Sequence, residues 1–156
     1  MSDTDAIGKL IEGERDHPMY PFRQVQDHSD SKTTMETVAL LTRQINVHNM
    51  KLHHSPFERI KSGEKKIELR LFDEKRQQIK AGDKIVFTDT ATGETLHKTV
   101  VKLHRFDTFD ELYQALPLLQ CGYTTDDIDQ AHPSDMEQYY SVAEQKKYGV
   151  VGIELC

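Results

Sequence analysis

The chain has 156 residues, of which 37% are hydrophobic and 29% are charged, and its net charge is −6. These values predict one globular domain, or one domain with an extension. No apolar run approaches the roughly 20 residues that a membrane helix needs, and the acidic balance argues against a protein that coats nucleic acid non-specifically. The polar, acidic first residues do not resemble a secretory signal, and the two distant cysteines form no disulfide framework, so we expect a cytoplasmic protein.

The charge is distributed unevenly along the chain. Residues 51–105 contain 13 basic and 8 acidic residues, a net charge of +5, whereas residues 1–50 and 106–156 have net charges of −3 and −8. A local anion-binding site is therefore compatible with an acidic protein. The alternative is that the basic third of the chain faces the acidic third within one fold.

The first 46 residues form a segment of different character. Residues 1–32 are polar and have little periodicity, which predicts a partly disordered extension. A capping-box pair, Thr33 and Glu36, then precedes apolar residues at helical spacing and predicts a helix over 33–46. We expect this helix to pack against the body of the protein, or to bind a second copy of the chain or another protein.

From residue 47 the pattern predicts a strand, a helix and a second strand. The first strand covers 47–53. Ser55, Pro56 and Glu58 predict that a helix starts with Ser55 as its cap, and Gly63 predicts its end. The strand over 65–71 alternates: its apolar residues face one way, and its charged residues, Lys66, Glu68 and Arg70, face the other.

The rest of the chain predicts further strands with short helices between them. Strands are expected over 84–88, over 95–106 with a bulge near Val100, and over 149–155. A helix capped by Thr108 and ended by Pro117 is expected, with short helices near 125–131 and 134–140, the last capped by Ser134. Five or six short strands with short flanking helices predict an α+β fold with a small mixed β-barrel over 47–156.

The segment 63–70 contains the most informative cluster of ionisable residues. A glycine turn is followed by Lys65, Glu68 and Arg70 within six residues. This arrangement can bind a phosphate or a base edge, with Glu68 accepting from an amino group. It can also catalyse a reaction in which Lys65 is the base or nucleophile and Glu68 its proton partner. The remaining alternative is a solvated strand face whose charges compensate each other.

The pattern Gly63-x-Lys65-x-x-Glu68-x-Arg70 matches the G-x-K-x-x-E-x-R signature of the ASCH domain, a branch of the PUA-like superfamily. The chain also resembles a bacterial ASCH group in further stretches, at 57–63, 73–76, 81–85, 139–141 and 148–153. The resemblance covers roughly residues 47–155. It implies a PUA-like β-barrel with a cleft beside it and an RNA or nucleotide ligand. We expect no cofactor.

The resemblance also implies an enzymatic alternative. The family includes amidohydrolases of N4-acetylcytidine, in which a lysine, a threonine and a glutamate act together, and members with ribonuclease activity. Lys65 corresponds to that lysine, whereas Glu68 occupies the position of the threonine, so the hydroxyl is absent here. In this alternative the chain is a hydrolase with Lys65 and Glu68 catalytic.

Other residues are secondary candidates for ligand contacts. Arg76 can extend a basic cleft, and Tyr140 and Ser141 can stack on a base or form hydrogen bonds with it. Cys121 beside Gly122 is expected to be a buried small residue, not a nucleophile. The pair His53-His54 at a strand end lacks the helical spacing of a common metal pair, so we predict no metal site.

Overall fold

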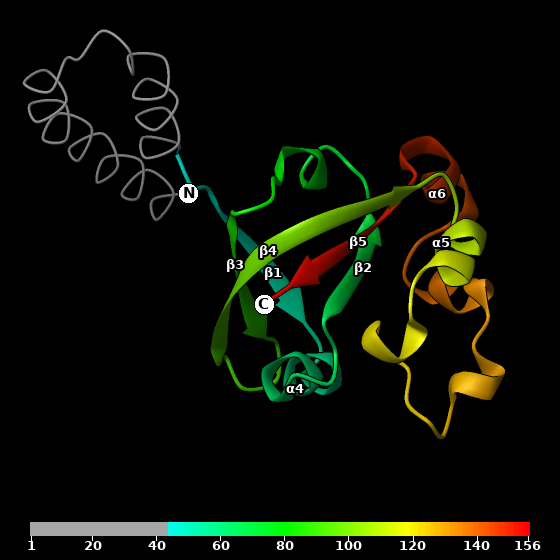
Figure 1. Ribbon diagram of the computed structural model, residues 1–156, viewed down its shortest axis with the longest axis horizontal. Coiled ribbons are helices and arrows are strands. Elements are labelled where there is room, and N and C mark those ends of the chain that lie inside the picture. The colour runs from blue at the N-terminus through cyan, green and yellow to red at the C-terminus, as the bar shows by residue number, and fades with distance from the viewer. Residues whose placement is uncertain (1–43) are drawn as a thin grey trace, which may run out of the picture. The chain divides into compact units, whose positions relative to one another are not determined.

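A computed structural model describes residues 44–156, and this part of the chain is built around one five-stranded sheet with the strand order β1-β3-β4-β5-β2. The neighbouring pairs β3–β4, β4–β5 and β2–β5 are antiparallel. The sheet curls into a half-barrel whose edge strands, β1 and β2, border an open seam (Figure 1). The strands are β1 (Val47–Leu52), β2 (Ile67–Leu71), β3 (Lys84–Asp89), β4 (Thr95–Phe106) and β5 (Val150–Leu155).

Short helices lie at one end and on one side of this sheet. The helix α4 (His54–Ser62) connects β1 to β2, and α5 and α6 lie together beside β2 (Figure 1). The predicted α+β class, with a small mixed barrel and short helices, is confirmed. The other helices and 3-10 turns are η1 (Arg76–Gln78), α5 (Phe109–Ala115), η2 (Leu118–Gln120), η3 (Ile128–Gln130), η4 (Pro133–Gln138) and α6 (Val142–Tyr148).

The predicted N-terminal extension lies almost entirely outside the described residues. Only 44–46 of the helix expected over 33–46 are described, and these three residues are not helical. The extension, and its proposed role in binding a second copy or another protein, therefore stay predictions.

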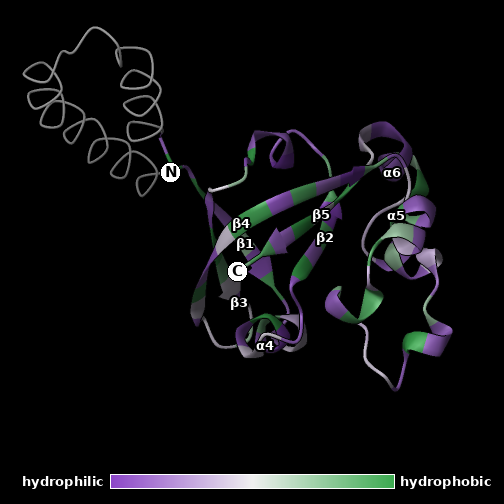
Figure 2. Cartoon of the chain, viewed as in Figure 1, coloured by the Kyte–Doolittle hydropathy of each residue, from purple (hydrophilic) through white to green (hydrophobic). Residues whose placement is uncertain are grey.

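The apolar residues form two cores, one on each side of β2 and β5, and the strands in Figure 2 accordingly alternate in hydropathy. The first core lies inside the half-barrel under α4, and Phe57, Ile85 and Phe87 within it are fully buried. The second core lies between β2 and α5, where the apolar face predicted for 65–71 packs on Phe109 and Leu112. The members of the second core are Ile67, Leu69, Leu71, Phe109, Leu112, Cys121, Met136 and Val150.

Two features of the long strands reflect this packing. The register between β4 and β5 shifts between Val100 and Lys102, which confirms the predicted bulge. Position 152 in β5 accommodates only glycine, because a Cβ there would lie 2.7 Å from Leu116 Cδ1 and 3.1 Å from Ile67 Cγ2. Leu116 thereby packs directly on the backbone of β5.

The starts of two helices differ from the prediction. The helix α4 begins at His54, with His53 as its N-cap and no side-chain cap, so Ser55 is inside the helix. Pro56 is tolerated as the third helical residue because the first N–H groups of a helix have no intrahelical partner. In the same way Pro133 begins η4, and the His132 side chain, not Ser134, is the cap. The helix predicted near 125–131 is reduced to η3.

The helix α6 was not predicted, although its capping sequence is present. The Ser141 hydroxyl accepts a hydrogen bond from the Glu144 N–H, and the Glu144 carboxylate accepts from the Ser141 N–H, both at 3.1 Å. Gly149, with φ of 72°, ends the helix directly before β5. The turn between Tyr140 and the last strand is therefore a capped helix.

Candidate functional site

A cleft of about 660 Å³ lies between the start of α4, strand β2 and the segment from α5 to η4. Its floor is formed by the charged residues of the motif, Lys65, Glu68 and Arg70. Lys51, His53 and Arg59 lie on the α4 side, and tyrosines line the opposite wall. The other lining residues are Leu52, Ser55, Pro56, Leu69, Tyr113, Cys121, Gly122, Tyr123, Asp127, Asp135, Met136, Gln138, Tyr139 and Tyr140.

The floor of the cleft is a buried cluster of three charges. Lys65 Nζ lies 2.7 Å from Glu68 Oε1, and Arg70 Nε lies 2.8 Å from Glu68 Oε2. Glu68 is 3% exposed and Lys65 is 9% exposed. Each carboxylate oxygen thus accepts from one cation, and the alternative of a solvated strand face is excluded.

The charge of Glu68 is maintained by its two partners. Burial works to raise the pKa of the Glu68 carboxyl, but the charges and hydrogen bonds of Lys65 and Arg70 outweigh it, so this pKa lies below its ordinary value. Burial works to lower the pKa of Arg70, and Glu68 raises it above its ordinary value. The floor of the cleft therefore contains a fixed carboxylate between two cations.

Local structure holds Lys65 and Arg70 in place. Gly63 ends α4 with φ of 88°, a conformation that favours glycine. The chain then returns so that the Lys65 N–H donates to the Arg59 carbonyl at 3.0 Å. Across the open seam, the Arg70 guanidinium donates to the Lys51 carbonyl of β1 at 2.9 Å. The motif thus spans the gap between the two edge strands of the half-barrel.

The opposite wall contains a hydrogen-bonded chain of polar side chains. The Tyr113 and Tyr123 hydroxyl oxygens are 2.7 Å apart, and the Tyr123 hydroxyl donates to Asp135 Oδ2 at 2.6 Å. Burial raises the pKa of both tyrosines, so both stay protonated. Tyr140 stacks on Phe109 with a ring separation of 6.3 Å, whereas Tyr139 is 57% exposed. This wall offers aromatic surface as well as hydroxyl groups.

Cys121 lies in the lining of the cleft and belongs to the second core. Burial raises the pKa of its thiol to about 12, although Lys65 works to lower it. Because the thiolate is the nucleophilic form of cysteine, the structure agrees with the expectation of a buried small residue.

The structure brings together four of the six predicted ligand residues. Lys65, Glu68, Arg70 and Tyr140 line the cleft, whereas Arg76 and Ser141 do not. Arg76 is paired with Asp73 at 3.2 Å, and its Nε is a buried donor without a partner in the described part of the chain. The Ser141 hydroxyl is used as the cap of α6.

Of the tyrosine wall only Tyr140 was predicted from the sequence, and no residue on the α4 side of the cleft was predicted. Tyr113 and Tyr123 are 10 residues apart, and nothing in their spacing indicates the 2.7 Å contact. Lys51 and Arg59 belong to a strand and a helix that only the fold brings to one cleft. Gly122 lies against Lys65 with φ of 116°, a backbone conformation that favours glycine.

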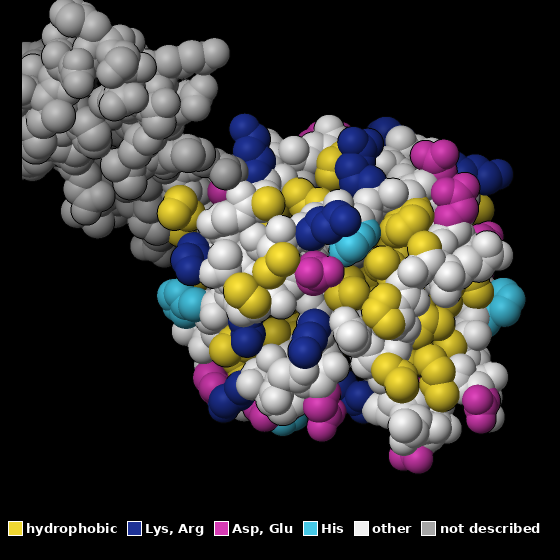
Figure 3. Space-filling view, in the orientation of Figure 1, with side chains coloured by type: hydrophobic (Ala, Val, Ile, Leu, Met, Phe, Trp, Pro, Cys, Tyr) yellow, Lys and Arg dark blue, Asp and Glu magenta, His cyan; other side chains and the backbone are white. Residues whose placement is uncertain are grey.

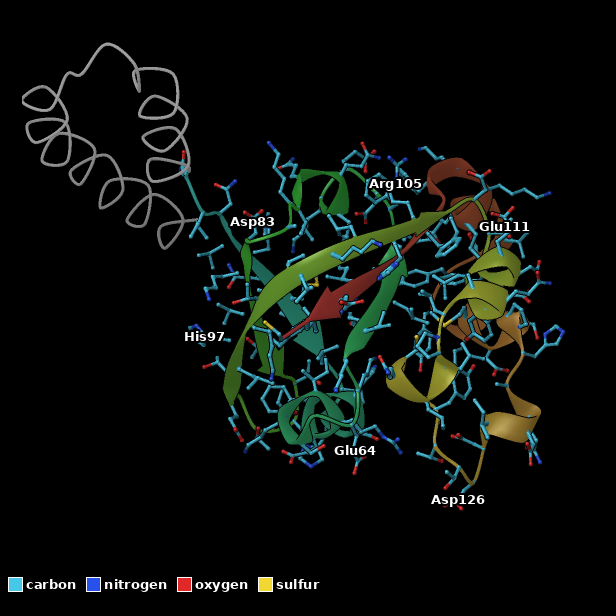
Figure 4. The ribbon with its side chains drawn as sticks, viewed as in Figure 1. Glu64, Asp83, His97, Arg105, Glu111 and Asp126 are labelled. Carbon is cyan, nitrogen blue, oxygen red and sulfur yellow. The ribbon has the colours of Figure 1, made fainter. Side chains whose placement is uncertain are left out.

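A second hollow, of about 520 Å³, lies between the end of β4 and α6. Three cations line it, Arg105, Lys146 and Lys147, together with Asp107 and Glu111; Figure 4 labels Arg105 and Glu111 at this end of the sheet. None of the three cations forms an ion pair within residues 44–156. Arg105 instead lies over the Phe72 ring, 4.0 Å from its centre.

The surface charge is mixed. On the face in Figure 3, basic, acidic and histidine side chains lie among one another over the sheet, and hydrophobic side chains gather beside them. The main cleft contains four basic side chains (Lys51, Arg59, Lys65, Arg70) and three carboxylates (Glu68, Asp127, Asp135). The cleft is thus only weakly basic, and its specific feature is the arrangement of its charges.

The curled five-stranded sheet with a cleft at its open seam defines a small barrel of the PUA-like class. The chain matches the ASCH domain over residues 50–155 and belongs to that family. No curated protein matches it. Among the helices of the described residues, none has the length and apolar character needed to cross a membrane.

Two solved structures are similar to the chain. The crystal structure of the hypothetical protein PH0355 is 35% identical with a TM-score of 0.59, and the match covers 70% of this chain and 96% of that one. The solution NMR structure of protein PF0455 from Pyrococcus furiosus is 34% identical with a TM-score of 0.55, covering 70% of this chain and 94% of that one. Each match thus covers nearly the whole of the solved chain.

Proposed function

We propose that this ASCH domain binds a nucleotide of RNA in the main cleft, with the base against the tyrosine wall and its polar edge on Lys65 and Glu68. The observation that carries the proposal is the buried Glu68 carboxylate between two cations, opposite the wall that contains Tyr113 and Tyr139. A volume of about 660 Å³ is within the range of small-molecule sites. Bases stack on aromatic side chains whatever their sequence.

The motif acts on the base in this proposal. Glu68 accepts from an exocyclic amino group through the remaining lone pairs of its oxygens, as a carboxylate does with cytosine. Lys65 has further N–H donors besides the one that faces Glu68, and donates to a base carbonyl. A donor and an acceptor side by side match a base edge that presents an amino group beside an acceptor.

In this proposal Lys65 and Arg70, the cations of the motif, do not bind the phosphate. Lys65 and Arg70 both interact with Glu68 already. Lys51 and Arg59 both line the cleft; Lys51 is exposed, and Arg59 donates to the Gly122 carbonyl at 3.3 Å. We therefore assign the phosphate to Lys51 and Arg59.

The test is the affinity of the full chain for a fluorescent eight-nucleotide single-stranded RNA, measured by anisotropy. Tyr139→Ala removes an exposed stacking surface and is expected to weaken binding about tenfold, since base stacking contributes ~1–3 kcal/mol per base. Lys51→Ala is expected to weaken binding and to reduce its salt dependence. Val101→Ala and Lys66→Ala, which change exposed residues outside the cleft, are the matched controls. Equal effects of the cleft variants and the controls would contradict the proposal.

A hydrolase is the second candidate, and the buried contact of 2.7 Å between Lys65 and Glu68 favours it. A lysine held beside a carboxylate in a cleft can position water or receive a proton. With Glu68 at the threonine position and the Cys121 thiol protonated, no side-chain nucleophile other than Lys65 is assigned. Incubation with N4-acetylcytidine and with RNA, followed by mass spectrometry, distinguishes the two functions. Turnover that is lost in Lys65→Ala would establish the enzyme, and binding without turnover would establish the binding domain.

A further inference from the structure

Three potential metal ligands meet on the side of α4 that does not line the cleft. His54 and Glu58 are one turn apart on this helix, and Asp89 is the last residue of β3. His54 Nδ1 lies 2.7 Å from Asp89 Oδ2. The ligand atoms of the three residues all lie within 4.8 Å of one another. The metal ligands considered from the sequence were His53 and His54, whereas the helical spacing that matters is that of His54 and Glu58.

The surrounding backbone fixes Asp89. Its carboxylate is fully buried: Oδ1 accepts from the Ala91 N–H at 2.9 Å, Oδ2 contacts His54 Nδ1, and the Thr92 side chain also forms a hydrogen bond with it. Two contacts join the turn after β3 to the end of β1 and to α4. The Thr90 N–H donates to the Leu52 carbonyl at 2.9 Å, and Lys61 lies 2.7 Å from Glu94.

Small side-chain movements would bring the three ligand atoms to the spacing of a first-row transition-metal site. Ligand atoms at 2.0–2.2 Å from a tetrahedral ion lie roughly 3.4 Å apart. The contact between His54 and Asp89 would open by less than 1 Å, and the exposed side chain of Glu58 can rotate towards the ion. One imidazole with two carboxylates neutralises a divalent ion, and the nitrogen ligand favours zinc-type ions over magnesium or calcium.

We propose that His54, Glu58 and Asp89 form a binding site for a divalent transition-metal ion, with water in the remaining position. The ion connects the first turn of α4 to the turn between β3 and β4. His53, Ser55 and Pro56 belong to the same turn of the chain and line the nucleotide cleft. A bound ion therefore stabilises one wall of the cleft, and the site exists whether or not the cleft binds a nucleotide.

The test uses the untagged full chain after removal of metals with a chelator. Calorimetric titration with Zn²⁺ is expected to show one saturable equivalent, and Co²⁺ is expected to give visible absorption bands of a site with one nitrogen and several oxygen ligands. His54→Ala and Glu58→Gln are each expected to weaken Zn²⁺ binding by about tenfold or more. Both residues are exposed, so neither variant is expected to unfold the protein.

The matched control is His97→Ala. This histidine is exposed on β4, and Figure 4 labels it at the outer side of the sheet, away from α4. The control is expected to bind Zn²⁺ as the unchanged chain does. A chain that binds no saturable equivalent, or that binds one equally well in His54→Ala, would overturn the proposal and leave His54 and Asp89 as a hydrogen-bonded pair only.

Discussion

The main cleft and the hollow beside α6 differ in the burial and pairing of their charged side chains. In the main cleft, Lys65 and Arg70 are largely buried and each is paired with Glu68. In the hollow beside α6, Lys146 and Lys147 are exposed and form no ion pair within residues 44–156. Fixed, desolvated groups can distinguish one ligand from another, whereas exposed cations attract any anion and are screened by salt. The cleft is thus suited to recognition, and the second hollow only to attraction.

The largest expected effect is that of removing the shared carboxylate. Glu68→Ala leaves two buried cations without their partner and is expected to lower the free energy of unfolding by about 3–5 kcal/mol. The matched variant is Glu94→Ala, which breaks the exposed pair with Lys61 and is expected to cost much less, since exposed ion pairs contribute little to stability. Urea denaturation of both variants measures the difference. Equal losses would mean that burial does not distinguish the two ion pairs.

The second expected effect is a dependence of stability on pH. The pKa of Glu68 is lower in the folded chain than its ordinary value of 4.5. A depressed pKa means that the folded state favours the ionised form, so the stabilisation is complete above the unfolded pKa and is lost as the pH falls towards the folded value. The stability difference between the unchanged chain and Glu68→Gln should be constant from about pH 7 to 5 and shrink below about pH 4.5. Urea denaturation of both proteins across this pH range measures the difference. A stability difference that grows as the pH falls would contradict a depressed pKa of Glu68.

A smaller effect is expected on the tyrosine wall. Tyr123→Phe removes the hydroxyl that donates to Asp135 and contacts Tyr113, and is expected to cost about 1–2 kcal/mol. Tyr139→Phe removes an exposed hydroxyl and is expected to change stability by less than about 0.5 kcal/mol. Thermal denaturation of the two variants gives the comparison. A neutral Tyr123→Phe would show that the hydrogen-bonded chain does not support the wall.

The smallest effect is expected in the second hollow. Replacing Lys146 and Lys147 together by alanine should change the free energy of unfolding by less than about 0.5 kcal/mol. Affinity for single-stranded RNA should fall by roughly two- to fourfold at low salt, and this difference should vanish at high salt. Anisotropy at two salt concentrations measures it. A loss that persists at high salt would place a specific contact in this hollow and remove the contrast with the cleft.

The sequence predicted the parts of the fold that depend on local pattern. The alternation around Ile67 and Leu69, the bulge after Val100 and the glycine end of α4 all arise from neighbours along the chain, and the structure contains each of them. The predicted start of α4 lies two residues after the observed one, because Pro56 is compatible with any position in the first helical turn. The capping sequence of α6 was overlooked beside Tyr140.

The candidate site was predicted only where one short segment supplies it. Glu68 and Arg70 are two residues apart on β2 and share one face of the strand, so their contact follows from the strand itself. Lys65 precedes β2, and the turn after Gly63 brings it to Glu68. The alternation alone does not predict that Glu68 is buried. Whether its face of β2 is exposed to solvent depends on how α4 and β1 pack. The wall with Tyr113, Tyr123 and Asp135 is assembled by tertiary contacts alone.

The most direct test of the account is to locate the bound nucleotide by chemical-shift mapping. The ¹⁵N-labelled full chain is titrated with cytidine and adenosine monophosphates, and the amide signals are followed. We expect the largest shifts at residues 64–70, 120–123 and 139–140, which surround the Lys65–Glu68–Arg70 cluster. Shifts confined to residues 105–107 and 146–149, around the second hollow, or no saturable shifts in either region, would contradict the claim that the cleft is the nucleotide site.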